Sequence, residues 1–301
     1  MEPAIEVGQR SILAEEWIMT NSNILPSGRT RIDHLEMKGI TKRFPGVLAN
    51  DNVDFDVRAG EVHALLGENG AGTSTLMKVL YGMYAPEEGE MWLTGEPANI
   101  HSPTDAIDQG IGMIHQHFML VDTLTVAENV ALGLPSSRGP LTDLARVSER
   151  ILELGEIYGL PVDPDAYIWQ LAVGQKQRVE IIKALYRGAA LLILDEPTAV
   201  LTPLEVDEFF VTLRQMVDDG HAVIFISHKL HEVLDISNRV TVLRDGKSVD
   251  SCETAGCTKA DLARMMVGRE VIMKPDRADM QPGEALLTLK NLHALSDREL
   301  P

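Results

Sequence analysis

A glycine-rich turn that directly follows an apolar strand constrains the fold of this chain more than any other feature. Residues 61–66 (Glu-Val-His-Ala-Leu-Leu) are typical of a strand, and a glycine, four residues and a second glycine follow. Glycines permit backbone angles that turn successive N–H groups toward one point, and a helix that starts there adds its positive dipole end. The pattern predicts a phosphate-binding loop made of Gly67, Glu68, Asn69, Gly70, Ala71, Gly72, Thr73, Ser74 and Thr75.

One position of this loop departs from the pattern. The pattern has a lysine after the second glycine, where it gives a point charge to phosphate groups, whereas Thr73 supplies only a neutral hydroxyl. Ser74 follows at the position where a hydroxyl ligates Mg²⁺. An ordinary glycine-rich turn stays open as an alternative. A dinucleotide-binding turn is disfavoured, because its third glycine would fall at Thr75.

Strand and helix signals alternate along the chain. Residues 190–194 and 222–226 are short, continuous apolar runs that predict buried strands. Helical periodicity extends over residues 141–160 and beyond Gly174. Helix starts are marked by Ser102 before Pro103 and by the capping boxes Thr125–Glu128 and Thr202–Glu205. The alternation predicts an α/β fold with a parallel sheet.

Polar side chains stand at the ends of two of these strands. Asp195 and Glu196 follow residues 190–194, where the first could lie near Mg²⁺ and the second near an attacking water. A solvated acidic strand end is the alternative. His228 follows the strand at 222–226, and a purely structural histidine stays open there. A metal site at His228, His231 and Glu232 is disfavoured, since no further ligand cluster accompanies them.

Charge and hydropathy limit the partners. The net charge of −18 argues against a surface that wraps nucleic acid and against docking on anionic lipid by charge alone. The sequence has no apolar run near the roughly 20 residues that span a bilayer, and its first residues are acidic where a signal peptide is basic. We expect a cytoplasmic chain, with Cys252 and Cys257 reduced.

The chain is expected to contain more than one domain. Residues 1–33 lack a clear period and are interpreted as an N-terminal extension, followed by a domain over 34–270. Residues 271–285 are polar, contain prolines and are interpreted as a linker. Residues 35–40 (Leu-Glu-Met-Lys-Gly-Ile) are then echoed by Leu-Thr-Leu-Lys-Asn-Leu, so residues 286–301 are interpreted as the truncated start of a second copy.

In this order, the motifs resemble the nucleotide-binding domain of ATP-binding-cassette (ABC) transporters over about residues 34–270. The resemblance implies a P-loop NTPase fold with a RecA-like core, an antiparallel β subdomain and a helical subdomain that carries the signature motif. It also implies that Asp195 is the Walker B aspartate and Glu196 the catalytic glutamate. Gln116 matches the glutamine that senses Mg²⁺ and couples to membrane subunits. His228 matches the switch histidine. A loop residue with local hydrogen bonds is the alternative for Gln116.

The signature segment is the most specific part of the resemblance. It contains Leu171, Ala172, Val173, Gly174 and Gln175. The family's signature serine contacts the γ-phosphate held by the opposite cassette, but position 172 is an alanine. Thr202 stands at the D-loop where an aspartate is common, and Thr73 replaces the Walker A lysine. Phe44 matches the aromatic residue that stacks on adenine, with a core phenylalanine as the alternative.

The residues within several motifs resemble one branch of the family, the importers of simple sugars and nucleosides, which carry two cassettes on one chain. The segments that carry this likeness are residues 112–118, 125–129, 196–203 and 266–270. The branch implies binding of ATP and Mg²⁺, a second cassette, transmembrane permease subunits and, indirectly, an extracytoplasmic solute-binding protein. It implies no nucleic acid and a place at the cytoplasmic face of the plasma membrane.

The sequence therefore favours an ATP-hydrolysing importer subunit and leaves two other functions open. One is a degenerate or regulatory cassette that binds nucleotide with little turnover, because Thr73 replaces the lysine. The other is a soluble ABC protein of translation or repair. The importer-like residues around Gln116 and the acidic net charge argue against a protein of translation or repair.

Overall fold

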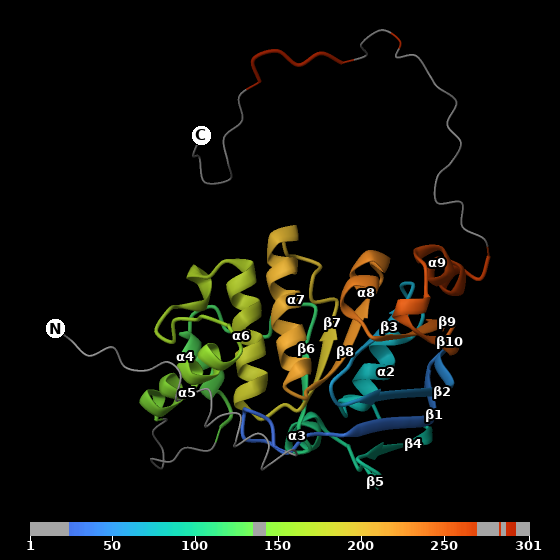
Figure 1. Cartoon of the computed structure of the whole chain (residues 1–301), viewed down its shortest axis with the longest axis horizontal. Coiled ribbons are helices and arrows are strands. Elements are labelled where there is room, and N and C mark those ends of the chain that lie inside the picture. Colours follow the sequence, from blue (N-terminus) through green and yellow to red (C-terminus); the bar gives the residue numbers. More distant parts are fainter. Residues whose placement is uncertain (1–23, 135–142, 270–282, 284–286, 293–301) are drawn as a thin grey trace, which may run out of the picture. The chain divides into compact units, whose positions relative to one another are not determined.

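The computed structural model describes residues 24–134, 143–269, 283 and 287–292. The chain divides into two units, residues 1–270 and residues 271–301. Strands and helices alternate in the first unit, so the predicted α/β class is confirmed. Figure 1 shows α4, α5 and α6 at one end of this unit and the strands β1, β2, β4 and β5 at the other.

Buried, mostly apolar strands form the centre of the larger sheet, as unbroken hydrophobic runs predict. The strand order is β10-β9-β3-β8-β7-β6, parallel except for β10, which pairs antiparallel with β9. The strands are β3 (Val62–Gly67), β6 (Ile111–Ile114), β7 (Leu191–Asp195), β8 (Ala222–Ser227), β9 (Arg239–Arg244) and β10 (Lys247–Glu253). The predicted strands near residues 61–66, 190–194 and 222–226 are therefore present.

The smaller sheet is antiparallel and has the order β2-β1-β4-β5. Its strands are β1 (His34–Phe44), β2 (Val47–Arg58), β4 (Glu88–Leu93) and β5 (Glu96–Pro97). Alternate residues such as Leu35, Met37 and Val57 are buried, because one face of this sheet packs against the core. This sheet is the predicted antiparallel β subdomain.

The predicted helix starts are present with their capping contacts. Thr125 and Glu128 cap one helix, Thr202 and Glu205 a second, and Ser102 with Pro103 a third. The helices are α2 (Thr73–Leu80), α3 (Pro103–Asp108), α4 (Val126–Ala131), α5 (Leu144–Ile157), α6 (Val173–Tyr186), α7 (Pro203–Asp218), α8 (Leu230–Ile236) and α9 (Lys259–Val267), with short turns η1 (Ile168–Gln170) and η2 (Thr254–Gly256). Among the described residues, no helix is long and apolar enough to cross a bilayer.

The two ends of the chain are described only in part. Residues 24–33, assigned from the sequence to the extension, contribute Leu25 and Ile32 to the buried core. In the second unit, residues 287–292 form no strand, and Leu287 and Leu292 are exposed. Residues 1–23 and most of the predicted linker and second domain lie outside the described residues.

The two cysteines lie close together in the fold. Cys252 lies near the end of β10 and Cys257 directly after η2, so the turn brings the two residues together. Their sulfur atoms are in contact, and the expectation that both thiols are reduced stays a prediction.

A buried histidine joins the two sheets through an arginine. Arg239 on β9 pairs with Asp56 on β2 at 2.7 Å and with Glu61 before β3 at 2.9 Å. Arg239 Nη2 also lies 3.1 Å from His63 Nδ1, and His63 Nε2 lies 2.8 Å from Thr241 Oγ1. Because arginine only donates, His63 Nδ1 must accept, so its proton is on Nε2 and the ring is neutral. Burial, with the Arg239 charge, lowers the pKa of His63 to about 4.

We expect the free energy of unfolding to fall as the pH is lowered from about 6.5 to about 4. In that window the unfolded chain binds a proton at His63 that the folded protein excludes, so acid favours unfolding. Denaturant unfolding across the window measures this. His63→Gln should reduce the slope by about one proton, whereas His101→Gln, at an exposed position, should not. An unchanged slope in His63→Gln would show that His63 is not the group responsible.

Candidate functional site

The predicted phosphate loop connects the end of β3 to the start of α2. Gly70 and Gly72 have φ angles of +87° and +99°, which only glycine adopts easily. A Cβ at Gly72 would clash with the Ala49 carbonyl oxygen, so the loop also needs glycine for close approach. Asn50 Nδ2 donates to the Gly72 carbonyl at 3.2 Å, which fixes the loop from β2. The first turn of α2 has no side-chain cap, which leaves its N–H groups available to an anion.

Thr73 opens α2 and turns its methyl group toward the base of the loop. A Cβ built on Gly67 would lie 3.0 Å from Thr73 Cγ2, so the two residues are close neighbours. Thr73 is half-buried and carries no charge. The loop conformation is therefore formed without the lysine of the pattern.

Ser74 and Asp195 meet across the edge of the sheet. Ser74 Oγ donates to Asp195 Oδ1 at 3.3 Å, which brings the start of α2 to the end of β7. Asp195 is 8% exposed, and burial raises the pKa of its carboxyl, with the neighbouring Glu196 charge adding to the rise. A cation at this point would favour the charged carboxylate. The pair that the sequence proposes as metal ligands is thus brought together.

Gln116, Glu196 and His228 form a second cluster beside this pair. Gln116 Nε2 donates to Glu196 Oε2 at 3.4 Å, and His228 Nδ1 donates to Glu196 Oε1 at 2.8 Å. Glu196 has a φ of +47°, in the left-handed region that non-glycine residues rarely adopt. Its N–H is held by the Ile226 carbonyl of β8 at 3.1 Å. Strained backbone of this kind is common where a side chain must be aimed.

The segment proposed as the signature lies at the start of α6. Ala172 is the N-cap residue of this helix, and Gln175 Oε1 accepts from its N–H at 2.9 Å. Among the described hydrogen bonds, none joins residues 171–175 to the loop at 67–75.

Phe44 lies at the end of β1, outside the hydrophobic core clusters of the described residues. Its ring meets Tyr84 edge-on at 5.3 Å between centroids, and Lys42 Nζ lies 5.4 Å from its centroid. Phe44 is half-buried. These contacts leave its predicted stacking on adenine untested, and they add Tyr84 to the residues around it.

Glu232, one of the residues considered for a metal site, makes its contacts within the fold. Glu232 is buried and bonds to Lys229 Nζ at 2.9 Å and to Ser227 Oγ at 3.4 Å. In the part of the chain that the structure describes, no three histidine, cysteine, aspartate or glutamate side chains are grouped to hold a metal. Glu232 therefore stabilises the fold beside His228.

Sequence reasoning missed residues that support this site from a distance in the chain. Asn50 is fully buried and holds the loop at Gly72, yet nothing in the local pattern around it indicates this contact. Glu205 was identified only as part of a capping box. Its carboxylate also reaches the start of α6.

Known proteins resemble this chain over the segments that contain these motifs. The sequence model of the family described as ABC transporter matches residues 50–199. The glucose import ATP-binding protein TsgD13 of Haloferax volcanii is 50% identical, over 89% of this chain and 54% of that protein. The nucleoside import ATP-binding protein NupA of Lactococcus lactis subsp. cremoris is 49% identical, over 88% of this chain and 52% of that protein. The chain spans about half the length of the curated relatives it matches.

Solved structures show the same fold. The ADP conformation of MJ1267, an ATP-binding cassette of an ABC transporter, has a TM-score of 0.66 at 24% identity, over 77% of this chain and 94% of its own. The dimeric MJ0796, a bacterial ABC transporter cassette, has a TM-score of 0.63 at 25% identity, over 74% of this chain and 100% of its own. The predicted cassette fold is confirmed, and the chain belongs to the ABC transporter family as a protein with its ATP-binding domain.

Proposed function

We propose that this chain is the ATP-binding subunit of an importer for simple sugars or nucleosides, and that it binds and hydrolyses ATP with Mg²⁺. The observation that carries the proposal is the cluster of Gln116, Glu196 and His228 beside the Ser74–Asp195 pair. Acid, amide and imidazole groups at the mouth of a phosphate loop suit phosphoryl transfer to water. Relatives named for glucose and nucleoside import support the transported class.

Each side chain has a role that follows from its position. Ser74 and Asp195 would hold Mg²⁺, which supplies charge stabilisation to the phosphates when bound. Glu196 would orient and polarise the attacking water, since its carboxylate is aimed by the backbone of β7 and β8. Gln116 and His228, which donate to the two oxygens of Glu196, hold this carboxylate in its orientation.

The partners follow from the separation of the two binding segments. Residues 171–175 are on α6, away from the loop of the same domain, so we infer that they complete the site of a second cassette. The half-length match to the relatives supports a second cassette in the same protein, with residues 271–285 as linker and 286–301 as its start. Transmembrane permease subunits would hold this chain at the cytoplasmic face of the membrane. A solute-binding protein on the outside would complete the proposed importer.

The proposal is tested by ATP hydrolysis and uptake of labelled ribose and nucleosides in vesicles that contain the assembled transporter. Glu196→Gln should lower turnover by about a hundredfold or more, in the range of general-base catalysis. His231→Gln, outside the cluster, serves as the control. Transport that does not depend on ATP or on Glu196 would contradict the proposed function.

A second candidate is a cassette that binds nucleotide but turns over little, and Thr73 favours it. Loss of a hydrogen bond to a charged group costs about 1.5–3 kcal/mol, or roughly 10- to 100-fold in equilibrium or rate. We expect weak Mg-ATP binding and slow hydrolysis at this site, and a marked rise in turnover in Thr73→Lys. The measurement is hydrolysis in the assembled transporter with the second cassette's catalytic carboxylate removed. Equal hydrolysis rates in the natural chain and in Thr73→Lys, with no effect of Glu196→Gln, would favour the regulatory cassette.

Phe44 gives a prediction about the base of the nucleotide. Because its ring lies outside the core clusters, Phe44→Ala should weaken ATP binding by about 1–3 kcal/mol, as for stacking of a base on an aromatic ring. The melting temperature should change little. Calorimetric titration with Mg-ATP and thermal unfolding measure the two effects. A large loss of melting temperature at unchanged affinity would assign Phe44 to fold stability instead.

A further inference from the structure

Only one oxygen of the Glu205 carboxylate accepts hydrogen bonds at the start of its own helix, α7. Glu205 Oε2 accepts from the Thr202 N–H and from Thr202 Oγ1, each at 2.8 Å. These contacts form the capping box at the start of α7. The other oxygen, Oε1, is left for a partner outside α7.

Oε1 of Glu205 faces the start of α6. A Cβ built on Gly174 would lie 2.5 Å from Oε1, so this oxygen lies against the Gly174 backbone. Hydrogen bonds from Thr202, with a smaller contribution from the Gly174 backbone, lower the pKa of the Glu205 carboxyl. Gly174 does not have a positive φ, so its backbone conformation suits any residue. A side chain at this position would displace the Glu205 carboxylate, which occupies its space.

The start of α6 needs an acceptor of this kind. Its N-cap residue is Ala172, which makes no side-chain cap and leaves the first N–H groups of the helix without the usual hydroxyl. Gln175 supplies only the reverse half of a capping box, by accepting from Ala172. A carboxylate at a helix start also interacts favourably with the helix dipole.

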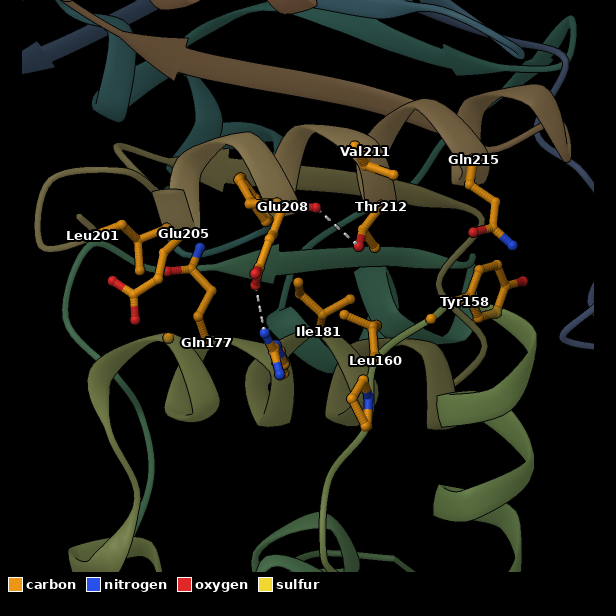
Figure 2. A pocket seen from close by; sticks show the side chains of 15 residues that line it. Tyr158, Leu160, Gln177, Ile181, Leu201, Glu205, Glu208, Val211, Thr212 and Gln215 are labelled. Atoms are coloured by element: carbon orange, nitrogen blue, oxygen red, sulfur yellow. Dashed lines mark hydrogen bonds and ion pairs between the residues drawn. The ribbon is translucent and has the colours of Figure 1, made fainter. Parts of the chain in front are cut away.

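A cavity and a further polar contact lie between α6 and α7 beside Glu205. A cavity of about 290 Å³ lies between α6 and α7, lined by apolar side chains such as Ile181 and Leu160. Figure 2 shows Glu205 at one end of this cavity and Tyr158 with Gln215 at the other. Arg178 Nη2 and Glu208 Oε2 form another polar contact between the helices, at 2.8 Å. Both helices also contribute to one hydrophobic core cluster, against which Leu171 packs, so these polar contacts add to the packing that places the α6 start.

We propose that Glu205 is a positioning residue that fastens the signature segment, residues 171–175, to the start of α7 and so to residues 199–202 before it. The fastening itself is a property of this fold. Its effect on turnover rests on the proposed function, in which residues 171–175 complete the site of the second cassette.

The chain offers a variant that separates this role from helix capping. At the start of α9, Asp261 forms a capping box with Thr258, whose hydroxyl and N–H donate to Oδ2 at 2.6 Å and 3.1 Å. Aspartate can therefore cap a helix at this position, although it is one methylene shorter than glutamate. Glu205→Asp should keep the capping box of α7 and withdraw the carboxylate from Gly174. Glu128→Asp, in the capping box of α4, is the matched control.

The first measurement is hydrogen exchange of the Gly174 amide in the full chain. We expect about tenfold faster exchange in Glu205→Asp, as for loss of one charge-assisted hydrogen bond. Exchange at Gly174 should be unchanged in Glu128→Asp, and Glu205→Asp should lower the melting temperature by no more than a few degrees. In addition, Gly174→Ala should lower the melting temperature less in a Glu205→Ala background than in the natural chain. Unchanged exchange at Gly174, or full additivity of the two substitutions, would overturn the proposal.

The second measurement is ATP hydrolysis by the assembled transporter. Glu205→Asp should lower kcat at the second cassette by about tenfold, while the affinity of this chain's own loop for Mg-ATP stays the same. Faster exchange at Gly174 without a change in kcat would make Glu205 a structural residue and overturn the positioning role. Absence of hydrolysis in the natural transporter would refute the proposed function instead, and the exchange measurement would still decide the fastening.

Discussion

The parallel pairing of β3, β7 and β8 is the constraint on which the whole site depends. Leu66 of β3 lies opposite Ser227 of β8, and Asp195 of β7 lies opposite Ile226, so the three strands end at one edge. Whatever follows these strands is therefore brought together: the glycine loop, Glu196 and His228. A change of register in one strand would move its polar group away from the others.

The loop keeps its shape without a lysine because its anchors are backbone groups. The Gly246 N–H donates to the Ala71 carbonyl at 3.1 Å, Asn50 donates to the Gly72 carbonyl, and the Ala71 N–H donates to Glu68 at 2.9 Å. None of these contacts involves the side chain at position 73. The geometry that receives a phosphate and the charge that holds it are therefore separate properties of this loop.

Local signals in the sequence predicted the elements and the chemistry at their ends, since apolar runs, capping boxes and glycine spacing act over a few residues. The helix α7 begins at Pro203 as its capping box indicates, and Asp195 ends a buried strand. Contacts between distant segments could not be predicted in this way. The approach of Glu205 to Gly174 depends on how two helices pack, and no short pattern records that arrangement.

Two of the three departures from the family's motifs, Ala172 and Thr73, have unequal consequences for a physical reason. Ala172 lacks a hydroxyl at a helix start, and the nearby Glu205 carboxylate can serve there as an acceptor for the helix cap, although it cannot donate to a γ-phosphate as the signature serine does. Thr73 lacks a positive charge, which only another cation can replace. Among the described residues, no lysine or arginine forms an ion pair or hydrogen bond with the side chains of residues 67–75. The first departure is offset within the fold only as a helix cap, whereas the second leaves the loop dependent on its backbone, its helix and the metal.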